Sequence, residues 1–183
     1  MNDGAENRSL EAMRVEDIMI PLDRYPQVTT DTSLAEAARV LKEAFLDLGN
    51  RSSLPRWLLV FTEQGQLVGS VRRRDIMRGL EPKHLLSEPL DYRKKLFDVK
   101  LDPDLSELSY DRLIREVREQ AARPVKKVMK PLQVTIHHDD HLIKAIYEMV
   151  SYGVSLLPVL RERRVVGVIR SVEVFNALTT ITD

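Results

Sequence analysis

The sequence contains no cysteine, so disulfides, thiolate metal sites and catalytic thiols are excluded from its 183 residues. A net charge is also absent, because 28 lysines and arginines balance 28 aspartates and glutamates. We therefore expect no binding to nucleic acid or to an anionic membrane. No apolar run approaches the roughly 20 residues of a membrane span, and the polar start lacks the hydrophobic segment of a signal peptide. These absences predict a cytoplasmic protein.

Signatures of catalysis are missing as well. The sequence has no GxSxG elbow, no HExxH motif and no Walker P-loop, so we expect that the protein is not an enzyme. The run HHDDH at 137–141 has residue types that bind metals. However, His137 and His138 adjoin at a strand end and should point to opposite sides, while Asp139 and Asp140 lie where a helix needs an N-cap. We expect no metal there.

What the sequence does contain is an internal repeat, whose segments recur in the same order in both copies. The matching segments are Val15–Pro21 (VEDIMIP) with Val125–Pro131 (VKKVMKP), Val28–Leu34 with Ile136–Leu142, Leu58–Val60 with Leu157–Val159, and Gly69–Asp75 (GSVRRRD) with Gly167–Glu173 (GVIRSVE). Chance likeness of one short segment is common. The same order throughout indicates two copies of one unit.

Hydrophobic periodicity and turn residues predict the order β-α-β-β-α for each copy. In the first copy the expected elements are a strand at Gln27–Thr29, a helix opened by a capping box at Ser33–Glu36, strands at Trp57–Phe61 and Leu67–Val71, and a closing helix with Asp75, Ile76 and Leu80. The apolar face of the first helix should comprise Leu34, Ala37, Ala38, Leu41, Phe45 and Leu48. In the second copy the expected elements are a strand at Gln133–Ile136, a helix at Asp140–Tyr152, a hairpin at Leu156–Arg170 and a helix from Ser171.

The openings, the LPV strand of the second copy and the Gly-apolar-apolar-x-x-x-acid endings resemble a tandem pair of cystathionine-β-synthase (CBS) domains, or Bateman module. The resemblance covers about residues 12–80 and 122–180. It implies an α/β fold in which two β-α-β-β-α repeats pack sheet to sheet with pseudo-twofold symmetry. It also implies a homodimer. The expected divisions are a flexible N-terminus at 1–11, repeat 1 at 12–80, a connector at 81–121 and repeat 2 at 122–183.

Two segments set this chain apart from a simple duplication. Leu34 and Leu58 are 24 positions apart, whereas Leu142 and Leu157 are 15 apart, so the first copy carries nine extra residues before its hairpin. The connector begins loop-like and should form a helix at about 109–122. An apolar stripe runs along that helix, made of Tyr110, Leu113, Ile114, Val117 and Ala121. We expect the module's own flank to bury the stripe, with a partner protein as the alternative.

The endings carry the candidate ligand site. In the resembled family the last strand ends Gly-apolar-apolar-Thr/Ser-x-x-Asp, which implies a hydroxyl on a nucleotide phosphate and an Asp on the ribose. Here Arg72 and Arg170 replace the hydroxyl, while Asp75 and Glu173 occupy the acid position. A guanidinium fork suits phosphate better than a hydroxyl does, which favours a phosphate-rich ligand such as AMP, ADP or ATP. The apolar residues expected to line the cleft are Val28, Leu58, Ile136, Leu157 and Pro158.

Two functions remain open at this point. The first is a regulatory module that binds an adenine nucleotide between the repeats and signals to a separate effector protein, which the sequence does not identify. The second is a ligand-free scaffold for dimerisation or interaction, whose nucleotide sites have degenerated. Arg73 and Arg74 are expected in solvent rather than on nucleic acid, and Trp57 is expected in core packing or a dimer contact, with adenine stacking as the alternative.

Overall fold

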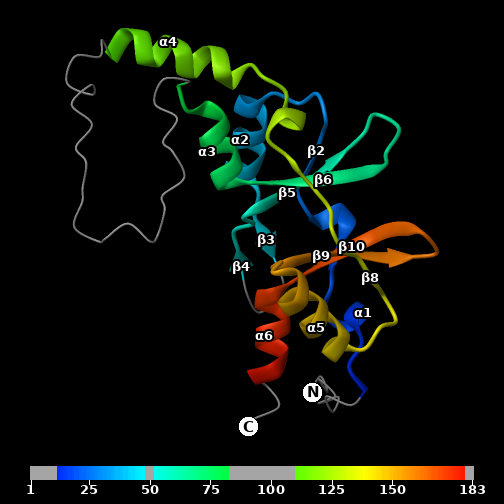
Figure 1. Ribbon diagram of the computed structural model, residues 1–183. Coiled ribbons are helices and arrows are strands. Elements are labelled where there is room, and N and C mark those ends of the chain that lie inside the picture. Colours follow the sequence, from blue (N-terminus) through cyan, green and yellow to red (C-terminus); the bar gives the residue numbers. More distant parts are fainter. Residues whose placement is uncertain (1–11, 48–51, 83–109, 180–183) are drawn as a thin grey trace.

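The computed structural model describes residues 12–47, 52–82 and 110–179 (Figure 1). Two four-stranded sheets are stacked on one another, and helices cover the outer face of each sheet. A hydrophobic cluster with Ile20, Tyr25, Leu59, Leu156 and Val168 lies between the sheets. The α/β fold with two packed repeats that the sequence predicts is therefore confirmed. None of the helices in these ranges is long and apolar enough to cross a membrane.

The first sheet has the strand order β2-β5-β6-β7. Its strands are β2 (Gln27–Thr29), β5 (Trp57–Phe61), β6 (Leu67–Arg72) and β7 (Lys130–Pro131). Strands β2 and β5 run parallel, and the other two pairings are antiparallel. Helices α2 (Leu34–Glu43) and α3 (Arg73–Leu80) pack on the outer face, where the strands turn Val28, Leu58, Val60 and Val71 toward Leu34, Leu41 and Ile76.

The second sheet has the strand order β1-β10-β9-β8. Its strands are β1 (Ile20–Pro21), β8 (Ile136–His137), β9 (Leu156–Arg161) and β10 (Arg164–Arg170). Helices α1 (Val15–Ile18), α5 (Leu142–Tyr152) and α6 (Ser171–Thr179) cover its outer face. Two 3-10 turns, η2 (Leu22–Arg24) and η5 (Val125–Lys127), follow the two openings or lie within them. The two sheets thus share one plan, as the repeat predicts.

The opening segments cross over between the repeats. Strand β1 is the end of the first opening, yet it pairs with β10 of the second repeat, and β7 at the end of the second opening pairs with β6 of the first. The repeated glycines allow these crossings. A Cβ on Gly69 would lie 2.7 Å from the carbonyl oxygen of Lys130, and one on Gly167 would lie 2.5 Å from that of Ile20. Each ending therefore requires a glycine, because any side chain there would clash with the backbone of the crossing segment.

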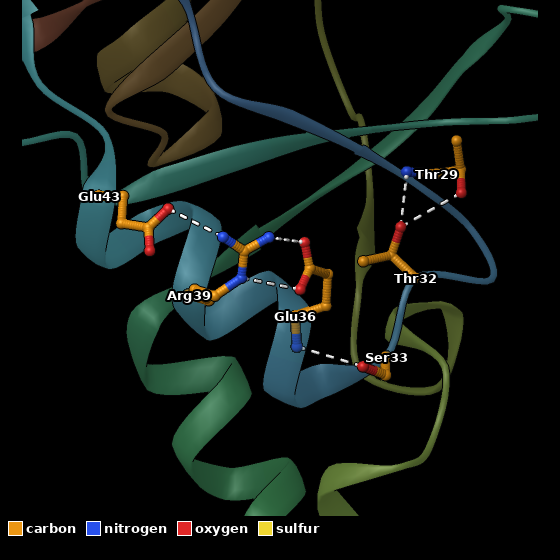
Figure 2. A network of polar contacts seen from close by, with 6 residues as sticks. All are labelled: Thr29, Thr32, Ser33, Glu36, Arg39 and Glu43. Carbon is orange, nitrogen blue, oxygen red and sulfur yellow. Dashed lines mark hydrogen bonds and ion pairs between the residues drawn. The ribbon is translucent and has the colours of Figure 1, made fainter.

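The start of α2 shows how local sequence sets a helix boundary (Figure 2). The hydroxyl of Ser33 accepts a hydrogen bond from the backbone N–H of Glu36 at 3.2 Å, as an N-cap does. The Glu36 carboxylate does not complete a capping box, because it accepts from Nε of Arg39 at 3.0 Å instead. Arg39 also reaches Glu43 at 3.1 Å. Before the helix, the Thr32 hydroxyl accepts from the N–H of Thr29 at 3.1 Å.

Several expected boundaries move. Helix α2 ends at Glu43, so Phe45 lies outside it and is exposed, and Leu48 lies outside the described residues. Helix α5 begins at Leu142 with His141 as its N-cap, since Nδ1 of His141 accepts from the N–H of Ile143 at 3.2 Å. Strand β8 is correspondingly shorter than the predicted one and starts at Ile136.

The two distinctive segments form structure of their own. Between α2 and β5, where the nine extra residues lie, β3 (Leu46–Asp47) pairs antiparallel with β4 (Ser52–Ser53). We call these two strands the β3–β4 pair. In the connector, α4 (Tyr110–Ala121) packs against α3 and α2. Leu113 is half-buried there. Tyr110, Ile114 and Val117 remain exposed, so this flank buries only part of the predicted stripe. The preceding part of the connector and residues 1–11 lie outside the described residues.

Candidate ligand site between the repeats

Each repeat ends with a strand that passes directly into a helix, and the candidate site residues lie at these junctions. Strand β6 ends at Arg72 and α3 follows at once, while β10 ends at Arg170 and α6 follows. The acid of each ending falls in the first turn of the helix. A carboxylate is favourable there, because the free N–H groups and the helix dipole carry partial positive charge. The sequence thus places one arginine and one acid together at each junction.

At the first junction Asp75 lies between two cations. Its Oδ2 accepts a hydrogen bond from the backbone N–H of Arg72 at 3.0 Å, and Nε of Arg72 lies 3.4 Å from the same oxygen. Its Oδ1 lies 3.8 Å from Nζ of Lys130. The guanidinium carbon of Arg72 lies 4.5 Å from the centroid of the Trp57 ring, a cation–π arrangement. Two cations against one carboxylate leave a local excess of positive charge.

A cavity of about 250 Å³ opens beside this group. This volume lies just below the roughly 300–1,000 Å³ that small-molecule pockets span. Both repeats contribute to its lining, which consists of Trp57, Ser70 and Arg72 from the first repeat and Lys130, Pro131, Leu132, Gln133, Val134, Tyr152, Gly153, Val154 and Leu156 from the second opening and repeat. Asp75 does not line the cavity itself, but it contacts Arg72 and Lys130, which do.

The wall from the second repeat depends on the end of α5. Gly153 caps that helix in the left-handed conformation, with φ of 61°, which favours glycine. The cap turns the chain sharply, so that Val154 and Leu156 follow Tyr152 along the same cavity. This wall is largely apolar, whereas Arg72 and Lys130 supply the charge. The cavity therefore has one apolar part and one cationic part.

The second junction has different geometry. Nε of Arg170 donates to Oε2 of Glu173 at 2.7 Å, and Nη2 donates to Oε1 at 2.5 Å. Nη1 donates to the Ser53 hydroxyl of the β3–β4 pair at 3.2 Å. Both charged side chains are buried, with exposed fractions of 7% for Arg170 and 10% for Glu173. The second arginine is thus held by three contacts.

Tyr25 lies next to this buried ion pair. Its hydroxyl is buried and has no hydrogen-bond partner among the described residues. Burial raises the pKa of Tyr25, and the charge of Arg170 works in the opposite direction. An open depression of about 340 Å³ lies nearby, lined by residues from Asp23 to Pro26 and from Glu43 to Leu46 together with Val40. Neither Arg170 nor Glu173 is part of that lining.

The structure places the five apolar candidates away from the cavity. Val28, Leu58, Ile136 and Leu157 are buried in the two sheet–helix cores, and Pro158 is buried on the same strand as Leu157. Side chains alternate across a strand, so the immediate neighbours face the cleft instead. Those neighbours are Trp57 beside Leu58 and Leu156 beside Leu157, and both line the cavity. The period of two in each strand was the signal that could have identified them.

Other residues raised by the sequence have contacts elsewhere. His138 approaches Glu16 at 2.8 Å, and Asp140 pairs with Lys144 at 2.8 Å while accepting from the N–H of His137. No group of three or more potential metal ligands occurs within the ranges that the structure describes. Arg73 and Arg74 are exposed at the start of α3. Lys130 and the end of α5 were not identified from the sequence, because their approach to β6 depends on the crossed opening segments.

Comparisons with known proteins agree with this architecture. A family model for the CBS domain matches residues 15–82 and 125–180. The chain is similar to a CBSX2 structure in complex with AMP (18% identity, 93% of this chain and 98% of that chain, TM-score 0.60); CBSX2 is a CBS-pair protein from Arabidopsis thaliana. It is also similar to the CBS domain of a membrane protein from Sphaerobacter thermophilus (18%, 93% and 91%, TM-score 0.64).

A further similar structure is a CBS domain pair in complex with 5′-methylthioadenosine and S-adenosyl-L-methionine (20% identity, 92% of this chain and 97% of that chain, TM-score 0.58). At these identities the likeness concerns the fold. Among curated proteins, no match to the chain is found.

Proposed function

Because the chain belongs to the CBS domain family and holds two CBS domains in tandem, we propose that it is a regulatory module that binds an adenine nucleotide in the cavity between the repeats. The observation that supports this proposal most directly is the cavity itself. It joins an apolar wall from the second repeat to Arg72 at the end of the first repeat and to Lys130 from the crossed second opening. A nucleotide has the matching division, since its base is flat and apolar-faced and its phosphates are anionic.

Different residues in and beside the cavity are proposed to bind the phosphates, the base and the ribose. The phosphates meet the guanidinium of Arg72 and the ammonium of Lys130, because charge-assisted hydrogen bonds to phosphate are the strong ones. The base lies toward Tyr152, Val154 and Leu156. For Asp75 to accept from the ribose through Oδ1, the ammonium of Lys130 has to move aside, because Asp75 does not line the cavity and its Oδ2 already accepts from the backbone N–H of Arg72. The cationic excess favours ligands with more phosphate, in the order ATP, ADP, AMP.

Trp57 provides a direct test, because it is the single tryptophan of the sequence and lines the cavity. A phosphate that draws Arg72 away from the indole changes the polarity around the ring. Titration with ATP should therefore change the emission of Trp57 saturably, and adenosine should bind more weakly. At 100 times Kd, bound ATP should also add about 2.7 kcal/mol to the free energy of unfolding. Unchanged emission and an unchanged melting temperature with every nucleotide would refute the proposal.

A scaffold without ligand is the second candidate function, and the second junction favours it. There Arg170 and Glu173 are bound to one another and buried. If the first cavity also fails to bind, both junctions are structural. Native mass spectrometry of freshly purified protein separates the candidates, because a retained nucleotide adds its mass to the 21.1 kDa chain.

The proposed module forms a homodimer and acts on a separate effector protein. Support for the dimer comes from the outer face of α5 and α6, where Ile143, Tyr147, Val150 and Phe175 are exposed. Exposed apolar side chains gathered on one face are typical of an interaction surface. Light scattering should give about twice the mass of the 21.1 kDa chain, and Tyr147→Glu should shift the protein toward the monomer. A wild-type monomer at micromolar concentration would contradict the dimer.

A further inference from the structure

The second cleft starts from residues that match those of the first. Counted along the repeat, Arg170 corresponds to Arg72, Glu173 to Asp75 and Leu156 to Trp57. In the first cleft the arginine keeps 42% of its side chain exposed beside a cavity. In the second cleft the arginine keeps 7%. Matching positions in one chain therefore adopt two different arrangements, and the cause lies in the residues that surround them.

The longer acid is one cause. Glu173 has one methylene more than Asp75, and its two oxygens accept from Nε and Nη2 of Arg170 in parallel. Asp75 is shorter and is held by the backbone N–H of Arg72, so it meets that guanidinium only through Nε. The bidentate pair fixes the plane of the second guanidinium. Among the described residues, neither terminal nitrogen of the first guanidinium has an acceptor, so both can contact another group.

The β3–β4 pair is the second cause. Ser53 accepts from Nη1 of Arg170, so each of the three guanidinium nitrogens already has an acceptor from this chain. Leu46, the residue opposite Ser53 in the β3–β4 pair, is buried with Tyr25 in the cluster between the sheets. The second repeat has no equivalent of the nine extra residues, and within the part of the chain that the structure describes no hydroxyl accepts from the guanidinium of Arg72. The insertion thus supplies both a hydroxyl and an apolar side chain at the second cleft.

We propose that the second cleft is occupied by the chain itself, with the β3–β4 pair and Glu173 in the place of a nucleotide, so that it takes no ligand. Glu173 provides the oxygens that a phosphate would offer to the arginine, and Ser53 completes its contacts. Leu46 and Tyr25 pack between the sheets beside this contact, and the open depression that they line does not include Arg170. The contact also joins the first repeat to the second, so the occupied cleft is a strut between them. Only the predicted number of bound nucleotides rests on the proposed function; the contact between the repeats does not.

Counting bound ligands tests the occupied cleft directly. In native mass spectrometry with increasing ATP, the wild-type chain should take up one ATP per chain, together with the emission change of Trp57. Two ATP per chain would overturn the proposal while leaving the proposed function intact. One ATP that leaves Trp57 emission unchanged, and whose binding Arg72→Ala does not weaken, would place the ligand at the second cleft and would also overturn it. If the chain binds no ATP at all, the result counts against the proposed function. The strut is then tested only by the stability measurements that follow.

Stability measurements test the strut without any ligand. Ser53→Ala should lower the melting temperature by about 3 °C or more, because it removes a hydrogen bond to a buried charged group. Ser52→Ala is the matched control, because Ser52 is the exposed neighbour of Ser53 on the same strand, and it should change the melting temperature by about 1 °C or less. In an Arg170→Met/Glu173→Leu background, where apolar groups replace the ion pair, Ser53→Ala should have no more effect than the control.

Equal effects of Ser53→Ala in both backgrounds would show that the hydroxyl does not serve Arg170, and would overturn the proposal. If the protein with the apolar replacements does not fold, the two serine variants are compared in the wild-type protein alone. Equal melting temperatures for Ser53→Ala and Ser52→Ala would then overturn the proposal.

Discussion

In the first cleft a guanidinium lies over an indole ring at 4.5 Å with 42% of its side chain exposed. In the second cleft the corresponding guanidinium is held in a bidentate ion pair and is 7% exposed. The acids differ by one methylene, and only the first repeat carries the β3–β4 pair. An arginine at the same position of the junction is therefore half-exposed beside a cavity in one repeat and buried in a bidentate ion pair in the other, depending on the length of the acid and on the residues that reach it.

Removal of Glu173 should have the largest effect. Glu173→Ala leaves Arg170 buried without its main partner, and loss of one partner of a buried pair costs about 3–5 kcal/mol. Asp75→Ala is the matched change at the first junction and should cost about 1 kcal/mol, mainly through the lost helix cap. Unfolding in urea measures both. Equal losses would mean that the two junctions do not differ in the way the burial of their arginines indicates.

The next largest effect should come from Arg72→Ala, measured as affinity for ATP. The substitution removes a charge-assisted hydrogen bond worth about 1.5–3 kcal/mol, which corresponds to a loss of affinity of roughly 10- to 150-fold. Affinity for adenosine should change little, because adenosine has no phosphate. Arg74→Ala is the control, since Arg74 is exposed at the same helix and does not line the cavity. Equal losses for ATP and adenosine would remove the phosphate contact.

Asp75→Asn should sharpen the assignment of the ribose. Its amide oxygen can still accept from the backbone N–H of Arg72, so the cap is retained, while the negative charge is lost. If Asp75 holds the ribose, ATP and adenosine should weaken by a similar factor, on the order of 10-fold for one charged hydrogen bond. Calorimetric titration of both ligands measures this. Tighter binding of ATP with unchanged adenosine would instead show that the carboxylate only offsets the cations.

The smallest effect should come from Lys130→Ala. The ammonium of Lys130 is half exposed, and contacts between exposed charges contribute about 0.2–1 kcal/mol. ATP affinity should fall a few-fold at low salt, and the difference from wild type should vanish near 1 M salt, where screening acts within about 3 Å. A difference that persists at high salt would mean that Lys130 becomes buried when ATP binds.

The repeated segments predicted the order of strands and helices in each copy, and the resemblance to a CBS-domain pair predicted how the two sheets pack. The sequence also predicted that an arginine and an acid lie together at the end of each last strand, which is where the structure has them. It missed the walls of the cavity by one position, since Leu58 and Leu157 face the cores while Trp57 and Leu156 face the cleft.

The contact that closes the second cleft could not be predicted. Ser53 and Arg170 are 117 positions apart, and the segment that carries Ser53 has no counterpart in the other copy. Comparison of the two repeats cannot predict the contacts of a residue that only one of them has. Its partner becomes evident only when the two sheets are stacked.

The crossing of the opening segments has a consequence for how the chain folds. Val15 is fully buried in the core of the second repeat, and Val125 is fully buried in the core of the first. Neither sheet can therefore be completed until its edge strand has arrived from the other opening. A fragment that ends at Pro82 would lack both β7 and Val125, and would expose the edge of β6. The two repeats should accordingly denature in a single cooperative transition, with a nucleation step that waits for contacts distant in sequence.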